Sequence, residues 1–438
     1  MKKLTLIAVA CSISGLLFGF DAGVISGVLV YLKNDFTITS YTEGFIVGAL
    51  PIGALFSALF AGQVMDYFGR RAVLFLTAAL YLIGTLLCTF ALGFEYIVAG
   101  RIFIGIGVGL SSTVTPLYLS ELAPKYMRGK IVTLYLISVN TGIFFSYLSN
   151  YFISHFESWR LMFFIAVVPA IILFTCLWFL PESPRWLYMR HRFAQAEQAL
   201  KTLYGKNLPK TDDIKDIQLN QQEKRVKLSQ INAQQKRLLF IGFGIGVFTQ
   251  AVGINAIIYY APTILMHSGV VSGNSAILAS LLIGFTVMVS AVLASFKLDQ
   301  FGRRTMLLNG LIGIIVCLFM MFIAYNVITS QTVLAWAILL LSVIYVFFQG
   351  ISVGPACFLL PAEIFPIAIR GIGMSISVAA NWLTNILVSF FFPTMLSTIG
   401  AGNAFLCFAV ISCVGWVFFN RYVLETNKIS LEEIAAKA

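Results

Sequence analysis

The chain has 438 residues, of which 59% are hydrophobic and only 11% are charged, and its mean hydropathy is +0.91. Soluble domains carry about a quarter charged residues, so this composition excludes an ordinary soluble enzyme. Apolar runs long enough to cross a bilayer core of about 30 Å recur along the whole length. Each run must be helical, because lipid offers no partners for backbone N–H and C=O groups. The sequence therefore predicts an all-α polytopic membrane protein with twelve transmembrane helices.

The predicted spans follow one another with short connections, except for a polar stretch between the sixth and the seventh. They cover residues 4–32, 44–65, 72–93, 95–119, 129–153, 159–181, 237–266, 275–297, 305–326, 332–361, 371–397 and 402–424. The first begins like a bacterial signal peptide, but its apolar run continues to Leu32, which is too long for a signal sequence. The seven cysteines fall in spans without metal-binding spacing, so we expect no metal site and no cofactor.

The formal net charge of +11 is distributed unevenly between the two sides of the predicted membrane. The side that holds both termini and every second loop carries 26 of the 29 Lys and Arg residues, and the opposite side carries Lys33 and Arg160. This asymmetry predicts that both termini are cytoplasmic. We therefore interpret the basic charge as a topology signal of a plasma-membrane protein, not as a nucleic-acid site. Compact loops favour a bacterial inner membrane.

Asp21 interrupts the first span, within the stretch GLLFGFDAGVISG of residues 15–27. The other charge deep in a predicted span is Arg101, in the fourth. At about 1.5 Å per residue, the two lie roughly 15 Å and 9 Å below the outer surface. Unpaired charges at such depth are costly, so intramembrane ionisable groups usually pair and usually mark ion paths. Two interpretations stay open: a pair that takes up a proton at Asp21, or a static buried ion pair.

Residues 182–236 break the hydrophobic rhythm and contain amphipathic segments such as FAQAEQALKTLY at 193–204, which predicts a cytoplasmic linker with short helices. The chain on either side repeats three motifs in the same order. The pairs are GQVMDYFGRR (62–71) with SFKLDQFGRR (295–304), ELAPKYMRG (121–129) with EIFPIAIRG (363–371), and PESPRWL (181–187) with LETNKIS (424–430). The repeat predicts two pseudo-symmetric six-helix halves, residues 1–181 and 237–424, with a tail at 425–438 and a binding site between the halves.

These motifs, together with RIFIGIGVGL at 101–110 and QAVGINAIIYY at 250–260, form an ordered family signature. The chain resembles the sugar porter family of the major facilitator superfamily, in particular its bacterial proton-coupled pentose and hexose symporters. The resemblance implies the major facilitator fold and transport by alternating access. The glycines of GIGVG lie inside a span with no preceding strand, so we interpret them as helix-packing residues and not as a dinucleotide loop.

The resemblance also assigns a role to the two buried charges. In proton-coupled members of the family, an Asp follows the F-G-F/Y tripeptide of the first span and pairs with the Arg that opens R-x-x-x-G-x-G. Asp21 and Arg101 match these positions. Passive facilitators commonly have a neutral residue such as Asn in place of the Asp. The resemblance therefore implies proton coupling through Asp21 and Arg101.

Charged residues at the cytoplasmic membrane edge form a second group of candidates. Arginines there can bind carboxylates and helix C-termini through charge-assisted hydrogen bonds. Pairs that tie one half to the other would hold this side shut, and the family assigns them that latch role in the outward-facing state. The predicted latch residues are Asp66, Arg70, Arg71, Glu121, Arg128 and Glu182 in the first half, and Asp299, Arg303, Arg304, Glu363 and Arg370 in the second. The alternative is that they set only topology and loop shape.

A sugar site needs hydrogen-bonding groups on several sides plus an aromatic face, and amides both donate and accept. The candidates for this site, most of which match sugar-contacting positions of the family, are Phe18, Thr249, Gln250, Asn255, Tyr259, Phe358, Asn381 and Trp382. The i, i+4 spacing of Asn255 and Tyr259 places both on one helix face. The alternative for Gln250 and Asn255 is hydrogen bonding between helices.

Some positions depart from the family pattern. Thr249 replaces the first residue of a Gln pair, and Phe358 replaces the usual Trp. Apolar residues replace usual polar contacts at Leu136, Ile143 and Val287. Asn140, one turn beyond Leu136, is the candidate substitute. The first-half wall is therefore expected to be more apolar than a standard glucose or xylose site, so a deoxy sugar, a smaller polyol or a less polar solute fits at least as well.

The leading hypothesis is a monomeric symporter that couples protons to a monosaccharide or polyol, with the lipid bilayer as its surroundings. Three alternatives stay open: a passive facilitator, a proton-driven exporter and a non-transporting nutrient receptor. The sequence offers no nucleophile–base set, no metal spacing and no phosphate loop, so we expect no enzymatic activity.

Overall fold

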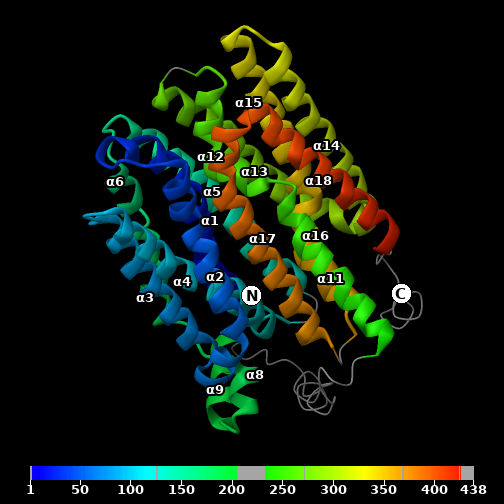
Figure 1. Ribbon diagram of the computed structural model, residues 1–438. Coiled ribbons are helices and arrows are strands. Elements are labelled where there is room, and N and C mark those ends of the chain that lie inside the picture. The colour runs from blue at the N-terminus through cyan, green and yellow to red at the C-terminus, as the bar shows by residue number, and fades with distance from the viewer. Residues whose placement is uncertain are drawn as a thin grey trace.

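The computed structural model describes residues 2–124, 127–204, 232–270, 272–366, 369–423 and 425; the side chains of a few of these, among them Arg128, Asp299 and Phe358, lie outside the described part. The described residues form helices and connecting turns without a strand (Figure 1). Twelve stretches of the described residues are long and apolar enough to cross a membrane, which confirms the predicted fold class.

In the part of the chain that the structure describes, the first half contains seven helices and the linker begins with two more. These are α1 (Lys2–Asp35), α2 (Ser40–Phe68), α3 (Arg70–Thr89), α4 (Phe94–Leu122), α5 (Arg128–Ser154), α6 (Trp159–Phe164), α7 (Val167–Leu177), α8 (Pro184–Met189) and α9 (Phe193–Tyr204). The helices of the second half are α11 (Ala233–Ala251), α12 (Ile254–His267), α13 (Gly273–Phe301), α14 (Arg303–Val327), α15 (Gln331–Phe348), the π-helix η3 (Gln349–Val353), α16 (Gly354–Ile364), α17 (Arg370–Thr398) and α18 (Gly400–Tyr422).

Three predicted spans are interrupted. The sixth consists of α6 and α7, the tenth contains η3 between α15 and α16, and the seventh breaks between α11 and α12. The break in the seventh follows from Gly253, whose φ of +91° lies in the left-handed region that glycine adopts at little cost. The Val252 carbonyl beside it accepts a hydrogen bond of 2.8 Å from the Tyr345 hydroxyl, so the break is satisfied within the protein.

Glycines allow the helices of each half to pack closely. A Cβ atom at Gly105 of α4 would lie 2.1 Å from the Leu50 carbonyl oxygen of α2, and one at Gly246 of α11 would lie 2.2 Å from the Ser377 carbonyl oxygen of α17. Backbones that approach this closely gain dispersion energy where the hydrophobic effect between helices is absent. The glycines predicted to serve helix packing therefore do so.

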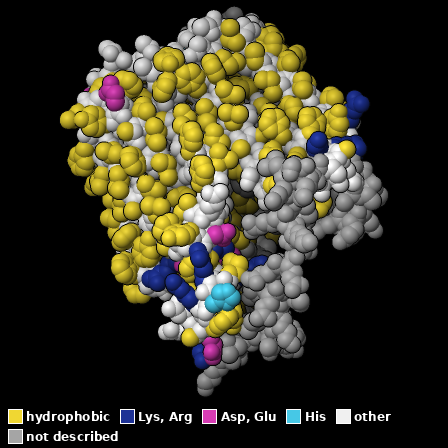
Figure 2. Space-filling model, turned by 60° about the horizontal axis from the view of Figure 1, so that its bottom comes forward, with side chains coloured by type: hydrophobic (Ala, Val, Ile, Leu, Met, Phe, Trp, Pro, Cys, Tyr) yellow, Lys and Arg dark blue, Asp and Glu magenta, His cyan; other side chains and the backbone are white. Residues whose placement is uncertain are grey.

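Charged side chains concentrate at one end of the bundle. Helices α8 and α9 pack there, at the bottom of Figure 1, and we call this end the linker end and the opposite one the far end. Trp186 of α8 donates through Nε1 to the Asp66 carbonyl at 2.9 Å, and the Tyr204 hydroxyl of α9 donates to the Leu122 carbonyl at 2.6 Å. Figure 2 shows Lys and Arg side chains gathered at this end, below a lateral surface that is largely hydrophobic.

The two halves meet toward the far end. The Tyr147 hydroxyl of α5 donates to the Ile258 carbonyl of α12 at 2.5 Å, and Tyr31 of α1 donates to the Asn274 side chain of α13. Helix α2 also packs tightly against α17, because a Cβ atom at Gly44 would lie 2.2 Å from the Phe390 carbonyl oxygen. These contacts close the far end.

We expect Gly105→Ala to destabilise the protein by about 1–3 kcal/mol, because the added methyl group forces α2 and α4 apart. Thermal unfolding in detergent, followed by size-exclusion chromatography, measures the change. Gly62→Ala is the matched control, since nothing lies within 4 Å of a Cβ atom there. Equal melting temperatures for the two variants would contradict the packing argument.

Candidate functional site

Asp21 and Arg101 form a buried ion pair between α1 and α4. Asp21 is 3% exposed and Arg101 is 0% exposed. Arg101 Nη1 lies 3.3 Å from Asp21 Oδ2, and Arg101 Nη2 donates to the Val47 carbonyl of α2 at 3.5 Å. The guanidinium is thus held by long contacts to two helices, and its Nε–H has no partner among the described residues.

Neutral titratable groups surround this pair. Tyr81 and Cys88 of α3 lie within electrostatic range of Asp21, and so does Tyr259 of α12 in the second half. Tyr259 is itself buried and lies against Asn385 of α17. The pair in the first half therefore lies within electrostatic range of a residue of α12, which carries predicted sugar-binding residues.

The predicted polar residues of the second half form one chain of hydrogen bonds. Asn255 Nδ2 donates to Gln250 Oε1 at 2.7 Å, and Gln250 Nε2 donates to Asn381 Oδ1 at 3.3 Å. Asn381 Nδ2 then donates to Thr249 Oγ1 at 3.1 Å. The break at Gly253 brings Asn255 back onto Gln250, although the two belong to different helices. We call these four residues the amide cluster.

The amide cluster includes the hydrogen bonding between helices that the alternative interpretation predicts, since its bonds join α11, α12 and α17. Its three amide side chains are only partly buried. They consequently combine mutual hydrogen bonds with accessible edges that could bind hydroxyl groups.

An aromatic contact crosses from one half to the other beside the amide cluster. The rings of Phe18 in α1 and Trp382 in α17 have centroids 5.9 Å apart and are tilted by 46°. Trp382 follows Asn381 directly in the chain, so α1 lies close to the cluster. The side chain of Phe358, also predicted here, lies outside the described residues.

The face of α5 toward the second half is mostly apolar. Leu136, Asn140, Ile143 and Tyr147 recur at helical spacing, and Tyr147 contacts α12. The Asn140 amide donates to the Leu136 carbonyl at 2.8 Å, so one of its donors is used within its own helix. The polar groups of the candidate site are therefore concentrated in the second half.

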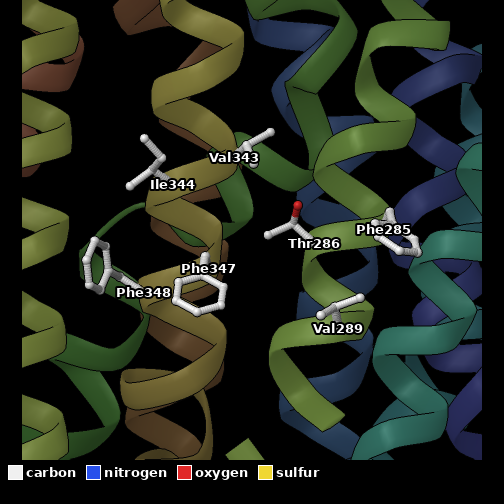
Figure 3. A pocket seen from close by; sticks show the side chains of 7 residues that line it. All are labelled: Phe285, Thr286, Val289, Val343, Ile344, Phe347 and Phe348. Carbon is white, nitrogen blue, oxygen red and sulfur yellow. The ribbon is translucent and has the colours of Figure 1, made fainter. Parts of the chain in front are cut away.

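A separate cavity of about 350 Å³ lies between α13 and α15 (Figure 3). Its lining consists of Phe285, Thr286, Val289, Val343, Ile344, Phe347 and Phe348. The Thr286 hydroxyl donates to the Leu282 carbonyl of its own helix at 2.7 Å. This lining offers no set of polar partners for a sugar and includes none of the predicted site residues, so we place the candidate site at the amide cluster instead.

At the linker end, the described first-half latch residues form one network around the buried Arg70–Glu121 pair. Arg70 donates to both carboxylate oxygens of Glu121 at 3.0 Å, and its Nη1 lies 3.3 Å from Asp66. The Glu182 carboxylate accepts from the backbone N–H groups of Arg70 and Arg71 at 3.0 and 3.2 Å, which caps the start of α3. Burial raises the pKa of the Glu182 carboxyl, while these backbone N–H groups oppose the rise.

The second half repeats this arrangement. Arg303 Nε donates to Glu363 at 3.3 Å, and its backbone N–H donates to Glu425 at 2.8 Å. Arg304 donates to the Asn420 carbonyl at 2.8 Å, and Arg370 donates to the Phe365 carbonyl at 3.2 Å. Each of these contacts joins elements of one half, whereas the sequence predicts ties between the halves. The side chains of Arg128 and Asp299 lie outside the described residues.

Residues 6–438 match the family described as "Sugar (and other) transporter". The chain belongs to this sugar transporter family. It is 36% identical to a probable metabolite transport protein, CsbC, of Bacillus subtilis, covering 97% of this chain and 92% of the relative. It is 35% identical to a D-xylose transporter of Levilactobacillus brevis (97% and 93%), and 32% identical to an arabinose-proton symporter of Escherichia coli (98% and 92%).

Solved structures of a family member resemble this sugar transporter over its whole length. The inward open form of the xylose transporter XylE from E. coli has a TM-score of 0.86 at 30% identity and covers 99% of both chains. The form of XylE bound to 6-bromo-6-deoxy-D-glucose has a TM-score of 0.81 at 29% identity, covering 100% of this chain and 99% of the other.

Several residues of the site were missed by sequence reasoning. Ser183 donates to Glu121 at 2.5 Å, Glu425 caps α14, and Asn385 lies against Tyr259. The repeat itself signals Glu425, which stands opposite Glu182 in the aligned motifs. The Val47 carbonyl has a weaker signal: Pro51, four residues later in this sugar transporter, has no N–H to donate to it.

We expect Glu121→Gln to destabilise this sugar transporter by about 3 kcal/mol, because it leaves the buried Arg70 guanidinium with only the exposed Asp66 as a charged partner. The side chains of Arg70 and Glu121 are both 3% exposed. Thermal unfolding in detergent measures the loss. Glu363→Gln is the matched control, since its pair with Arg303 is 28% and 16% exposed and should matter less. A larger loss in the control would contradict this ranking.

Proposed function

We propose that the protein is a symporter that couples proton entry to uptake of a monosaccharide or polyol by alternating access. The observation that carries the proposal is the placement of Phe18 and Asp21, three residues apart in α1. Phe18 contacts Trp382 beside the amide cluster, and Asp21 pairs with Arg101. One helix therefore joins the solute site to the ionisable pair.

Protonation of Asp21 would remove the negative charge that holds Arg101 to α1. The neutral carboxyl group no longer attracts the guanidinium strongly, so α1 and α4 can separate and carry the solute contacts with them. A membrane potential of 100 mV supplies about 2.3 kcal/mol per charge. At 1.36 kcal/mol per decade, one proton supports about fifty-fold accumulation.

The proposed solute binds with its hydroxyl groups toward the second half. The amide cluster supplies donors and acceptors there, and Trp382 and Phe18 supply aromatic surface. The apolar face of α5 lies on the first-half side. The names of the relatives include D-xylose, arabinose and glucose, which supports a monosaccharide as the solute class.

We further propose that the linker end faces the cytoplasm of a bacterial cell, because the basic residues of the chain gather on that side. The latch residues then brace each half while the linker end is open and exchange partners between the halves when it closes. A single copy suffices, since α1, α11, α12 and α17 of one chain supply the whole candidate site.

The second candidate function is passive facilitation. It is favoured by the full burial of the Asp21–Arg101 pair, which a static structural ion pair would also show. Proton movement separates the two functions.

In liposomes with an internal pH dye, we expect a transported sugar or polyol to acidify the interior in the unaltered protein but not in Asp21→Asn, which cannot release a proton. A panel of pentoses, hexoses and polyols identifies the solute. Glu43→Gln is the control, because Glu43 is another buried carboxylate of the same half, paired with Lys33 at 2.9 Å. Solute entry without proton movement in any variant would establish a passive facilitator.

We expect Gln250→Ala to raise the KM about ten-fold, because it removes a donor and an acceptor from the amide cluster and leaves Asn255 and Asn381 without a shared partner. Initial rates of uptake over a range of solute concentrations measure the effect. Asn326→Ala is the matched control, since the amide of Asn326 donates to the Phe322 carbonyl of its own helix. An unchanged KM in Gln250→Ala would place the solute elsewhere.

A further inference from the structure

Helix α2 contains a proline near its centre, and this proline leaves one backbone carbonyl of the helix without its usual donor. Pro51 has no N–H, so the carbonyl four residues earlier, that of Val47, lacks its helical donor. Val47 is fully buried, and a buried carbonyl without a partner is costly in the bilayer interior. The donor it receives is Arg101 Nη2, at 3.5 Å.

Within the described residues, two other prolines leave a helix carbonyl that accepts a side-chain hydrogen bond, with a neutral donor in each case. Pro262 opens the Ile258 carbonyl, which accepts from the Tyr147 hydroxyl at 2.5 Å. Pro393 opens the Ser389 carbonyl, which accepts from the Tyr260 hydroxyl at 2.8 Å. Against these two, the Val47 carbonyl stands out because its donor carries a charge and also binds the carboxylate of Asp21.

We propose that Pro51 is a positioning residue for proton coupling: it presents the Val47 carbonyl to Arg101, which is thereby shared between Asp21 of α1 and the backbone of α2. This inference rests on the proposed symport. When Asp21 takes up a proton, the guanidinium stays anchored to α2 through Val47. Helix α1 is then released from Arg101, while α2 keeps its link to α4.

Helix α2, which keeps Arg101, also contacts the second half. Its outer segment packs on α17, where a Cβ atom at Gly44 would lie 2.2 Å from the Phe390 carbonyl oxygen, and one at Gly48 would lie 3.7 Å from Phe390 Cβ. The rings of Tyr41 and Phe45 contact the Phe390 ring at 5.2 and 5.4 Å. The guanidinium that Asp21 releases thus stays attached to the helix whose contact with α17 closes the far end.

The surroundings of the pair leave Arg101 as the charge that acts on Asp21. The other titratable groups in electrostatic range of one or both partners are neutral at physiological pH, because phenols and thiols ionise only in more alkaline solution. They are Tyr81, Cys88, Tyr259 and Tyr260. The hydrogen bond to the Val47 carbonyl therefore determines how strongly the Arg101 guanidinium attracts the Asp21 carboxylate.

Pro51→Ala tests the inference, because alanine restores an N–H that donates to the Val47 carbonyl within α2. Arg101 then turns fully to Asp21, and the carboxylate is harder to protonate. Solute-driven proton entry into liposomes, measured from pH 5 to pH 9, should become half-maximal about one unit lower in pH. Counterflow of labelled solute, which needs no net proton transfer, should persist and so demonstrate a folded protein.

Pro116→Ala is the matched control, since Pro116 lies inside α4, fifteen residues from Arg101, or roughly 22 Å along the helix. Its pH profile should coincide with that of the unaltered protein. Pro51→Leu restores the same N–H and should reproduce the acid shift of Pro51→Ala. Coincident profiles for both Pro51 variants and the unaltered protein, with counterflow intact, would overturn this inference alone. Absence of solute-driven proton movement in the unaltered protein would overturn the proposed symport as well.

Discussion

Polar atoms in the bilayer interior have no water to bind, so each must find a partner inside the protein. This constraint explains most of the contacts between helices described above. Arg101 binds both Asp21 and a carbonyl that a proline has opened, and the amides of α11, α12 and α17 bind one another. Since each such bond joins separate helices, the groups that would serve transport also hold the bundle together.

At the linker end, both halves satisfy the free N–H groups at the start of a helix in the same way. In each half a glycine with positive φ, Gly69 or Gly302, precedes a helix whose first N–H groups bind a glutamate from a later segment. The negative charge of Glu182 or Glu425 is favoured there by the helix dipole. The halves differ in burial: the Arg70–Glu121 pair is nearly inaccessible, whereas the Arg303–Glu363 pair is partly exposed. The first-half pair is therefore the better shielded from water at this end.

The sequence was sufficient for the parts of the structure that depend on composition and on rare residues. Twelve spans follow from hydrophobicity, and the pairing of Asp21 with Arg101 follows from the scarcity of charges in those spans. Side-chain partners could not be predicted in the same way, because they depend on which helices meet at each depth. The bond between Gln250 and Asn255 needs the break at Gly253, and the partners of the latch arginines depend on which end of the bundle is closed.

The bond from Tyr147 to the Ile258 carbonyl has a consequence for how the far end opens. Pro262 ensures that this carbonyl has no helical donor to return to when the halves part. Water that enters from outside can take the place of the tyrosine hydroxyl, so the bond is exchanged and not simply lost. An exchanged hydrogen bond contributes only about 0.5–1.5 kcal/mol net. The far end is thus closed by a hydrogen bond that is stable in the absence of water and costs little free energy to break once water enters. A small free-energy difference from the solute or the proton can therefore decide between the closed and the open far end.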